Sequence, residues 1–143
     1  MKVLIMGLPN SGKTFLAKKI AEILKVPNIN ADALRQMCND WEFSEAGRVR
    51  QSERMAMIAN YENQRNDYVI CDFVCPTRKT REIFKAGFVI WMDTSRPCKY
   101  PDTIKIFENP KKFDYRVTAF DDADVEKIII KLLERKNTKI RKS

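Results

Sequence analysis

Histidine is absent from this 143-residue sequence, and its four cysteines form no CxxC pair. Because histidine is the commonest general base, we expect proton transfer to depend on carboxylates, lysine, tyrosine or water. Zinc sites and disulfide frameworks need particular spacings of cysteine and histidine, and none of these spacings occurs. The sequence therefore argues against both kinds of site and predicts reduced thiols.

Long apolar segments are missing as well. No segment approaches the roughly 20 apolar residues that span a bilayer. The opening stretch, MKVLIMGLP, is too short for a signal peptide and lacks a small-residue cleavage site. We therefore expect a cytoplasmic protein without membrane contact. Its length fits a single domain, expected over residues 1–136, followed by a basic C-terminal tail at 137–143.

The charge balance is strongly positive, with a formal net charge of +8. Such an excess favours anionic partners, among them nucleotides, sulfate esters and nucleic acid. Part of it lies in the C-terminal stretch ERKNTKIRKS, and a basic tail is more often solvated than bound. The charge alone therefore indicates a class of ligand without choosing among its members.

Short apolar runs alternate with helical patterns along the chain. Strands are expected at residues 2–7, 26–32, 67–74, 88–94 and 114–120, and helices at 12–25, 31–40, 44–66, 77–87 and 121–136. Ser44 is expected to cap the long third helix and Gly87 to close the fourth. Residues 95–113 contain three prolines and are expected to be irregular. The alternation predicts an α/β fold with a mostly parallel five-stranded sheet between layers of helices.

The first strand runs into the sequence GLPNSGKT, which matches the phosphate-loop pattern G-x-x-x-x-G-K-[ST] through Gly7, Gly12, Lys13 and Thr14. A strand before the loop and a helix after it are the context that this pattern requires. Backbone N–H groups and the helix N-terminus can surround phosphates, while Lys13 reaches the outer ones. The residues predicted to bind nucleotide are Gly7, Pro9, Asn10, Ser11, Gly12, Lys13, Thr14 and Phe15.

Two aspartates are expected at the ends of the second and third strands, Asp32 and Asp72. Ligands of open α/β sheets sit at these carboxyl ends, so both should face the phosphate loop. With Lys13 they form the predicted catalytic set, and with Thr14 they form the predicted magnesium set, partly through water. Asp32 has an alternative as the N-cap of the next helix, and it could also accept the proton of an acceptor hydroxyl.

Arg35 and Arg48 follow on the next two predicted helices, with Phe43 between them. Guanidinium groups match the geometry of phosphate and sulfate, and an aromatic ring can stack on a flat base. Each has a plainer alternative: a solvated helix face for the arginines and a core position for Phe43.

Several motifs together resemble the adenylyl-sulfate (APS) kinases, a family of P-loop kinases. NADALR (30–35) is similar to the family's D-G-D-N-x-R, and NDWEFSEAGRVRQSER (39–54) to its N-x-D-L-G-F-S-x-x-D-R-x-E-N-x-R-R. DFVCP (72–76) stands where the family has S-F-I-S-P. The resemblance covers residues 1 to about 94. It implies a three-layer P-loop kinase fold with strand order 2-3-1-4-5. It also implies an enzyme that uses ATP and Mg²⁺.

The resemblance also implies an acceptor pocket and a reaction. The pocket would be lined by Asp32, Arg35, Phe43, Arg48, Gln51, Phe73 and Val74. Phe43 would stack on the adenine of adenylyl sulfate, and Arg35 and Arg48 would hold its phosphosulfate. Transfer of the γ-phosphate of ATP to the 3′-hydroxyl would give PAPS. The partner is thus a small nucleotide-like acceptor, and a homodimer stays open as an assembly.

The sequence departs from the family pattern at several positions. The first aspartate of D-G-D-N-x-R is Asn30 here, the asparagine of E-N-x-R-R is Gln51, and the serine of S-F-I-S-P is Asp72. The family's longer lid, with R-D-P-K-G-L-Y, is replaced by a short lid-like segment at 95–113. Two alternatives therefore stay open: a kinase of another acceptor (a nucleotide, a polynucleotide 5′-hydroxyl or a hydroxylated base), and a nucleotide-binding protein with little turnover.

Overall fold

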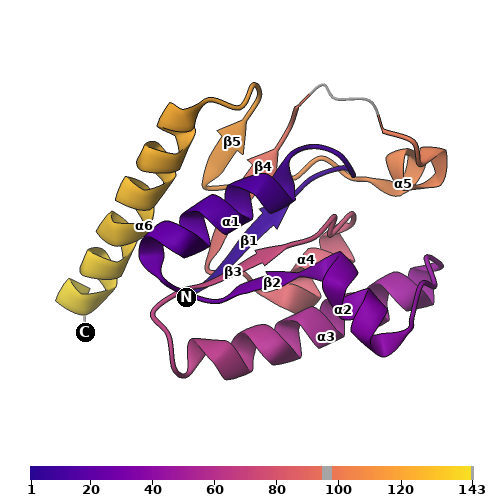
Figure 1. Ribbon diagram of the computed structural model, residues 1–143, viewed down its shortest axis with the longest axis horizontal. Coiled ribbons are helices and arrows are strands. Elements are labelled where there is room, and N and C mark those ends of the chain that lie inside the picture. Colours follow the sequence, from indigo (N-terminus) through magenta and orange to yellow (C-terminus); the bar gives the residue numbers. More distant parts are fainter. Residues whose placement is uncertain (95–97, 143) are drawn as a thin grey trace.

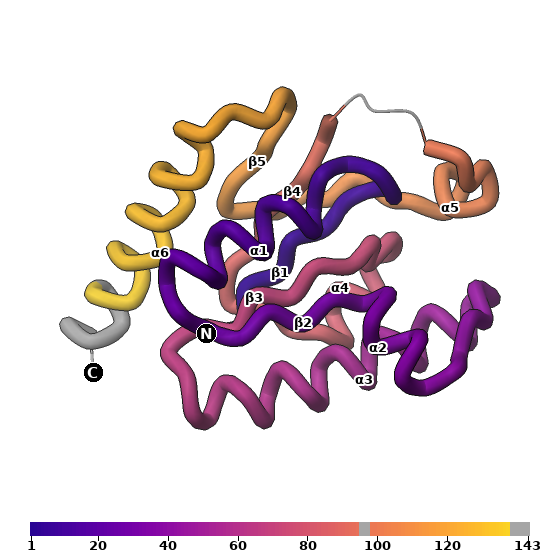
Figure 2. Tube along the Cα trace, in the orientation of Figure 1, coloured from indigo at the N-terminus to yellow at the C-terminus, as the bar shows by residue number. Residues whose placement is uncertain are grey.

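The computed structural model describes residues 1–94 and 98–142 (Figures 1 and 2). Its strands are β1 (Lys2–Met6), β2 (Asn28–Asn30), β3 (Val69–Asp72), β4 (Phe88–Met92) and β5 (Tyr115–Val117). Its helices are α1 (Lys13–Leu24), α2 (Ala31–Cys38), α3 (Glu45–Asn63), α4 (Arg78–Phe84), α5 (Pro101–Ile106) and α6 (Asp122–Lys142).

The strands form one sheet in the order β2-β3-β1-β4-β5, and every neighbouring pair is parallel. This confirms the predicted α/β fold and the predicted strand order. β1 lies at the centre of the sheet and leads directly into the phosphate loop. In the pairing of β2 with β3, Asn30 stands opposite Asp72, so these two side chains leave the sheet at the same edge.

Helices cover both faces of the sheet and give it three layers (Figure 1). Side chains of β1 alternate between the faces: Val3 and Ile5 join the core under α1 and α6, whereas Leu4 and Met6 join the core under α2, α3 and α4. This period of two is the geometry of a strand buried on both sides. The sheet is therefore a rigid base for the loops at its carboxyl edge.

The end of α4 differs from the expected one. Lys85, rather than Gly87, closes α4: its backbone is left-handed, with φ 56°, and its N–H donates to the carbonyl of Arg81. Gly87 instead begins the approach to β4, and its N–H donates to the carbonyl of Lys2 at 2.8 Å. Ser44 does cap α3, as expected, since its hydroxyl accepts from the N–H of Gly47.

The end of the second strand is also corrected. β2 ends at Asn30, and Asp32 lies in the first turn of α2. Asn30 is the N-cap, because its side-chain oxygen accepts from the N–H of Ala33 at 2.9 Å. An asparagine is as good a cap as aspartate, so the helix begins at Ala31, as expected, with Asn30 in place of Asp32 as its cap.

The expected irregular segment contains a short helix, α5, which starts on Pro101. Proline suits the first helical position because its missing N–H would have no partner there. Residues 95–97 of that segment lie outside the described part of the chain. α6 continues to Lys142, so the backbone has no break at the tail boundary expected at 137. Within the described residues, no helix is both long and apolar enough to cross a membrane.

Candidate active site

The loop between β1 and α1 is shaped by two glycines. A Cβ on Gly7 would lie 2.7 Å from the carbonyl oxygen of Met92 and 2.9 Å from the hydroxyl of Ser11, which leaves no room for any side chain. Gly12 is the N-cap of α1 and has φ 96°, a left-handed conformation that favours glycine. Because Gly12 brings no capping side chain, the first N–H groups of α1 are left for an anion.

Lys13 lies over this loop and is half-buried. Its ammonium donates to the carbonyl of Leu8 at 2.8 Å. Burial lowers the pKa of Lys13 to about 8, and the negative charges of Asp72 and Asp32 act in the opposite direction. Within the described residues, the buried hydroxyl of Ser11 has no hydrogen-bond partner. A desolvated ammonium and an unpaired hydroxyl in one loop suit a phosphate oxygen.

Asp72, the last residue of β3, is 2% exposed and accepts hydrogen bonds from three side chains. Thr14 donates to Oδ2 at 2.9 Å, Asn30 donates to the same oxygen at 2.7 Å, and Asn28 donates to Oδ1 at 2.9 Å. Burial raises the pKa of Asp72 above the usual value, and these three hydrogen bonds oppose that rise. The acid is thus fixed in place directly beside the hydroxyl that follows Lys13.

Asp32 has a different setting, on the exposed side of α2. Its charge raises the pKa of Lys13, so the carboxylate lies within electrostatic range of the phosphate loop. Asn30 caps α2, so the alternative of Asp32 as the N-cap is wrong. The carboxylate of Asp32 is thus exposed near the loop, whereas that of Asp72 is buried beside it.

Phe43 lies beside two arginines at the start of α3. Its ring centroid is 4.5 Å from the guanidinium carbon of Arg35 and 5.5 Å from that of Arg48. The ring is 53% exposed, so the alternative of a core position is wrong. A half-exposed ring flanked by cations can offer one face to a flat ligand.

The two arginines differ in what they hold. Arg35 is 5% exposed, which excludes a solvated helix face, and its guanidinium donates to the carbonyls of Asp40 and Glu42. Arg48 donates to the carbonyl of Phe43 at 2.9 Å and to the hydroxyl of Thr103 in α5 at 3.2 Å. Burial lowers the pKa of both arginines. Arg35 therefore shapes the loop at 40–44, while Arg48 joins that loop to α5.

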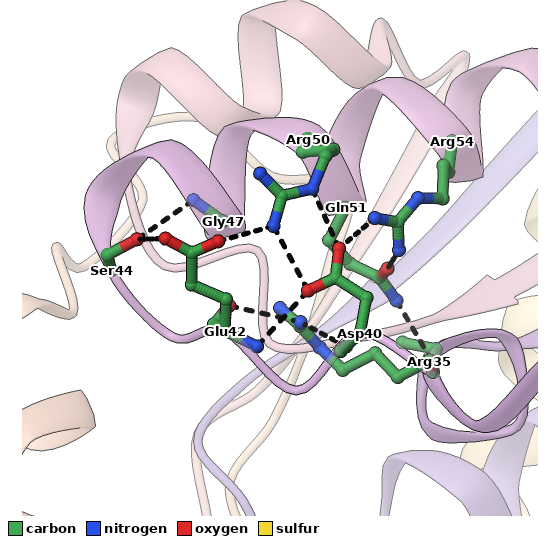
Figure 3. Close-up of polar contacts among 9 residues, drawn as sticks. Arg35, Asp40, Glu42, Ser44, Gly47, Arg50, Gln51 and Arg54 are labelled. Atoms are coloured by element: carbon green, nitrogen blue, oxygen red, sulfur yellow. Dashed lines mark hydrogen bonds and ion pairs between the residues drawn. The ribbon is translucent and has the colours of Figure 1, made fainter. Parts of the chain in front are cut away.

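An ion-pair network supports the same loop from behind (Figure 3). Asp40 accepts from Arg50 at 2.7 Å and also from Arg54, and these bonds hold the pKa of Asp40 well below its usual range. Arg50 also reaches Glu42 at 2.6 Å. The loop that carries Phe43 is thus fastened to α3 by several charged hydrogen bonds.

Three of the residues predicted to bind the acceptor are less available. Gln51 is buried: its amide donates to the carbonyl of Ala31 at 2.9 Å, which ties α3 to α2. Phe73 is 5% exposed and packs edge-on against Phe84 at 5.3 Å between centroids. Val74 is half-buried in the loop after β3. These residues support the wall of the site more than they face into it.

A groove of about 550 Å³ runs between α3, the start of α4 and the end of α5. It is lined by Phe43, Glu45, Arg48, Val49, Pro76, Thr77, Lys79, Thr80, Lys105, Ile106, Phe107 and Glu108. The contribution of α5 and of Thr103 was missed from the sequence, because an irregular segment was expected there. Asn28 was also missed; its only signal is the polar-apolar-polar alternation of NIN in a short strand.

A parallel sheet of this order with a phosphate loop after β1 defines a P-loop kinase, a phosphotransferase with a hydroxyl acceptor. Residues 1–96 match the family model described as adenylylsulphate kinase. The match covers about two thirds of the sequence, and the chain belongs to the adenylylsulphate kinase family.

Solved structures agree on the fold. The Mycobacterium tuberculosis APS kinase CysC in complex with AMPPNP and APS is 22% identical, with a TM-score of 0.78, covering 93% of this chain and 96% of that one. A gluconokinase from Sinorhizobium meliloti 1021 has TM-score 0.67 at 16% identity (99% and 97% covered). Shikimate kinase from Aquifex aeolicus has 0.66 at 16% (95% and 98%). No curated protein matches this sequence.

Proposed function

We propose that this protein transfers the γ-phosphate of ATP to the 3′-hydroxyl of adenylyl sulfate, with Mg²⁺. The observation that carries the proposal is Phe43, a half-exposed ring that lies beside Arg35 and Arg48 and lines the groove between α3, α4 and α5. A flat base with an anionic group attached fits a ring beside cations. The solved kinase of the same fold that binds AMPPNP and APS supports this choice.

The phosphate loop supplies the binding of the nucleotide. In the proposed complex, Lys13 leaves the carbonyl of Leu8 and donates to the outer phosphates, and Ser11 gains a partner for its hydroxyl. Backbone N–H groups at the start of α1 contribute partial positive charge. These groups hold negative charge in a setting with little water, where each hydrogen bond is strengthened.

The donor set at Thr14 and Asp72 fits magnesium. A hydroxyl and a carboxylate oxygen lie 2.9 Å apart beside the loop, and hard oxygen ligands are what Mg²⁺ prefers. Bound magnesium would neutralise charge on the transferred phosphoryl group. Thr14 and Asp72 would hold the ion, the latter in part through water, and Asp32 would complete the set from the exposed side.

The transfer step follows from these positions. The acceptor oxygen forms a bond to the γ-phosphorus as the bond to the leaving ADP oxygen breaks. In the proposed reaction the hydroxyl proton passes to Asp32, a choice supported by its exposed carboxylate. Lys13 remains with the phosphates throughout and stabilises the charge that develops on them.

Arg48 provides the test. Purified protein with Mg-ATP and adenylyl sulfate should form PAPS, and Arg48→Ala should reduce kcat/KM for the acceptor about 10- to 100-fold, since it removes a charged hydrogen-bond donor. The affinity for ATP should not change. Arg65→Ala is the matched control, because Arg65 also lies over an aromatic ring, that of Tyr61 at 5.6 Å, but is exposed at the far end of α3.

A second acceptor class has one observation in its favour. In the described part of the segment between β4 and β5, the one helix is the six-residue α5, where the family motif has a longer lid, so we infer that the groove can admit another hydroxyl compound. Label transfer from γ-labelled ATP to a sugar, a nucleoside or a DNA 5′-end, with no PAPS formed, would replace adenylyl sulfate as the acceptor. Nucleotide binding without transfer to any of these would contradict a kinase function altogether.

A further inference from the structure

The carboxylate of Asp72 is surrounded entirely by hydrogen-bond donors. Thr14 comes from α1, while Asn28 and Asn30 come from β2, and all three point at one buried group. Asn30 also donates to the hydroxyl of Thr14 at 3.3 Å, so donors and acceptors form a closed set. One negative charge is thus shared among three elements of the fold.

The orientation of both asparagine amides is fixed by their other contacts. The oxygen of Asn30 accepts from the N–H of Ala33, so its NH₂ group must face Asp72. The NH₂ group of Asn28 donates to the carbonyl of Ile70 as well as to Asp72. Neither amide can turn its oxygen toward the acid without losing a backbone partner.

Two of the positions at which this chain departs from the family motif, Asn30 and Asp72, are hydrogen-bonded to each other. The motif places an aspartate where this chain has Asn30 and a serine where it has Asp72. These residues stand opposite each other in the β2–β3 pairing, and their side chains are 2.7 Å apart. One carboxylate and one amide thus face each other at these two strand ends, and the pair carries one negative charge.

We propose that Asn30, backed by Asn28, is a positioning residue that holds Asp72 as the magnesium carboxylate, and that acid and amide can be exchanged between positions 30 and 72. This inference rests on the proposed function, because it concerns the magnesium of a bound nucleotide. It assigns to Asn30 a role in place of the motif's acid: the amide aims the acid instead of supplying one.

The exchange is chemically symmetric. In Asn30→Asp/Asp72→Asn, the new amide at 72 can donate to the new acid at 30 and still accept from Asn28. The acid at 30 remains a good N-cap for α2. In Asp72→Asn alone, two NH₂ groups meet, and in Asn30→Asp alone, two carboxylates meet. Each single change should therefore harm the site, and the double change should repair it.

The experiment measures the affinity of a non-hydrolysable ATP analogue by calorimetry, with and without magnesium chloride. The readout is the ratio of the two Kd values. In Asp72→Asn this magnesium enhancement should fall about 10-fold or more, as happens when metal-orienting groups are lost. In the double variant the magnesium enhancement should return to within about threefold of the wild-type value. This deficit is smaller than the roughly tenfold loss expected for Asp72→Asn. The melting temperature without nucleotide should follow the same order, with the double variant above Asp72→Asn.

Charge-matched controls lie far from the loop. Glu126→Gln removes one exposed carboxylate from α6 and Asn137→Asp adds one, and neither should change the enhancement. The inference is overturned if Asp72→Asn keeps the wild-type enhancement, or if the double variant is as deficient as Asp72→Asn. A wild-type protein without any magnesium-dependent nucleotide binding would instead contradict the proposed function, so the two failures are distinct.

Discussion

At the scale of single residues, the ammonium of Lys13 decides when the phosphate loop can bind an anion. Burial lowers its pKa to about 8, so the free loop loses this positive charge just above neutral pH. A bound triphosphate favours the charged form and raises that pKa again. Nucleotide binding is therefore coupled to proton uptake at pH values above about 8.

The first prediction is a pH dependence of nucleotide affinity. Above about pH 8, the Kd for ATP should rise by up to about tenfold per pH unit, because each binding event must first protonate Lys13. Calorimetry in two buffers of different ionisation heat would measure the proton taken up. Lys18→Met, on the exposed surface of α1, should keep the slope, and Lys13→Met should lose both slope and most of the affinity. A flat profile for wild type would refute the linkage.

Single residues also show what the sequence could and could not predict. Lys13 and Thr14 were predictable because a contiguous motif fixes their place on the loop. Asn28 was not, since its role depends on the pairing of β2 with β3, residues that lie 42 to 44 positions apart. Asp32 was expected at a strand end, but β2 ends at Asn30, which caps α2, and Asp32 lies in the first turn of that helix.

At the scale of elements, the start of α3 and the loop before it form one unit. Gly47 lies where a Cβ would come 2.2 Å from the carbonyl oxygen of Glu42, so the loop packs directly against the helix backbone. Arg35 and Arg50 hold the same loop by hydrogen bonds. The position of Phe43 is therefore set by this close approach as much as by its own sequence.

The second prediction concerns this approach. Gly47→Ala should push the loop away from α3 and lower the free energy of unfolding by about 1–3 kcal/mol, as overpacking does. It should also raise the KM for the acceptor, since Phe43 and Arg48 move with the loop. Urea unfolding and steady-state kinetics would measure the two effects. Met57→Ala, on the exposed face of the same helix, should change neither quantity. If Gly47→Ala left both the free energy of unfolding and the KM unchanged, the loop would not depend on this close approach.

Elements were predictable to the extent that their signals are local. Ser44 predicts the start of α3, because a hydroxyl that accepts from the N–H group three residues later is a local pattern. The prediction that Gly87 closes α4 was wrong, because Lys85 adopts the left-handed conformation that glycine usually supplies at this position. α5 was not predicted, because residues 95–113 contain three prolines and were expected to be irregular. One of these prolines, Pro101, begins the helix.

At the scale of the whole molecule, two cores on opposite faces of the sheet carry the stability. One joins α1 and α6 through residues such as Leu16 and Ile128, and the other joins α2, α3 and α4. The site lies at the carboxyl edge between them. Stability and ligand binding can therefore be altered separately.

The third prediction uses that separation. Ile128 is fully buried, so Ile128→Ala should lower the free energy of unfolding by about 2–5 kcal/mol without changing nucleotide affinity in the folded protein. Magnesium nucleotide at about 100 times its Kd should restore about 2.7 kcal/mol by mass action. Ile130→Ala on the same helix, 55% exposed, should have little effect. An altered nucleotide Kd in Ile128→Ala would show that the core and the loop are coupled.

Glu108, in the wall of the groove, is hydrogen-bonded to the segment that follows β3, the strand that ends at Asp72. Arg81 donates to the carbonyls of Cys75 and Pro76, and to that of Glu108 at 2.5 Å. The N–H of Glu108 donates back to the carbonyl of Pro76 at 2.7 Å. Because Cys75 and Pro76 follow Asp72 by only a few positions, these hydrogen bonds join the wall of the groove to the backbone beside the acid. We therefore expect a change in the width of the groove and a change in the position of the buried acid to accompany each other.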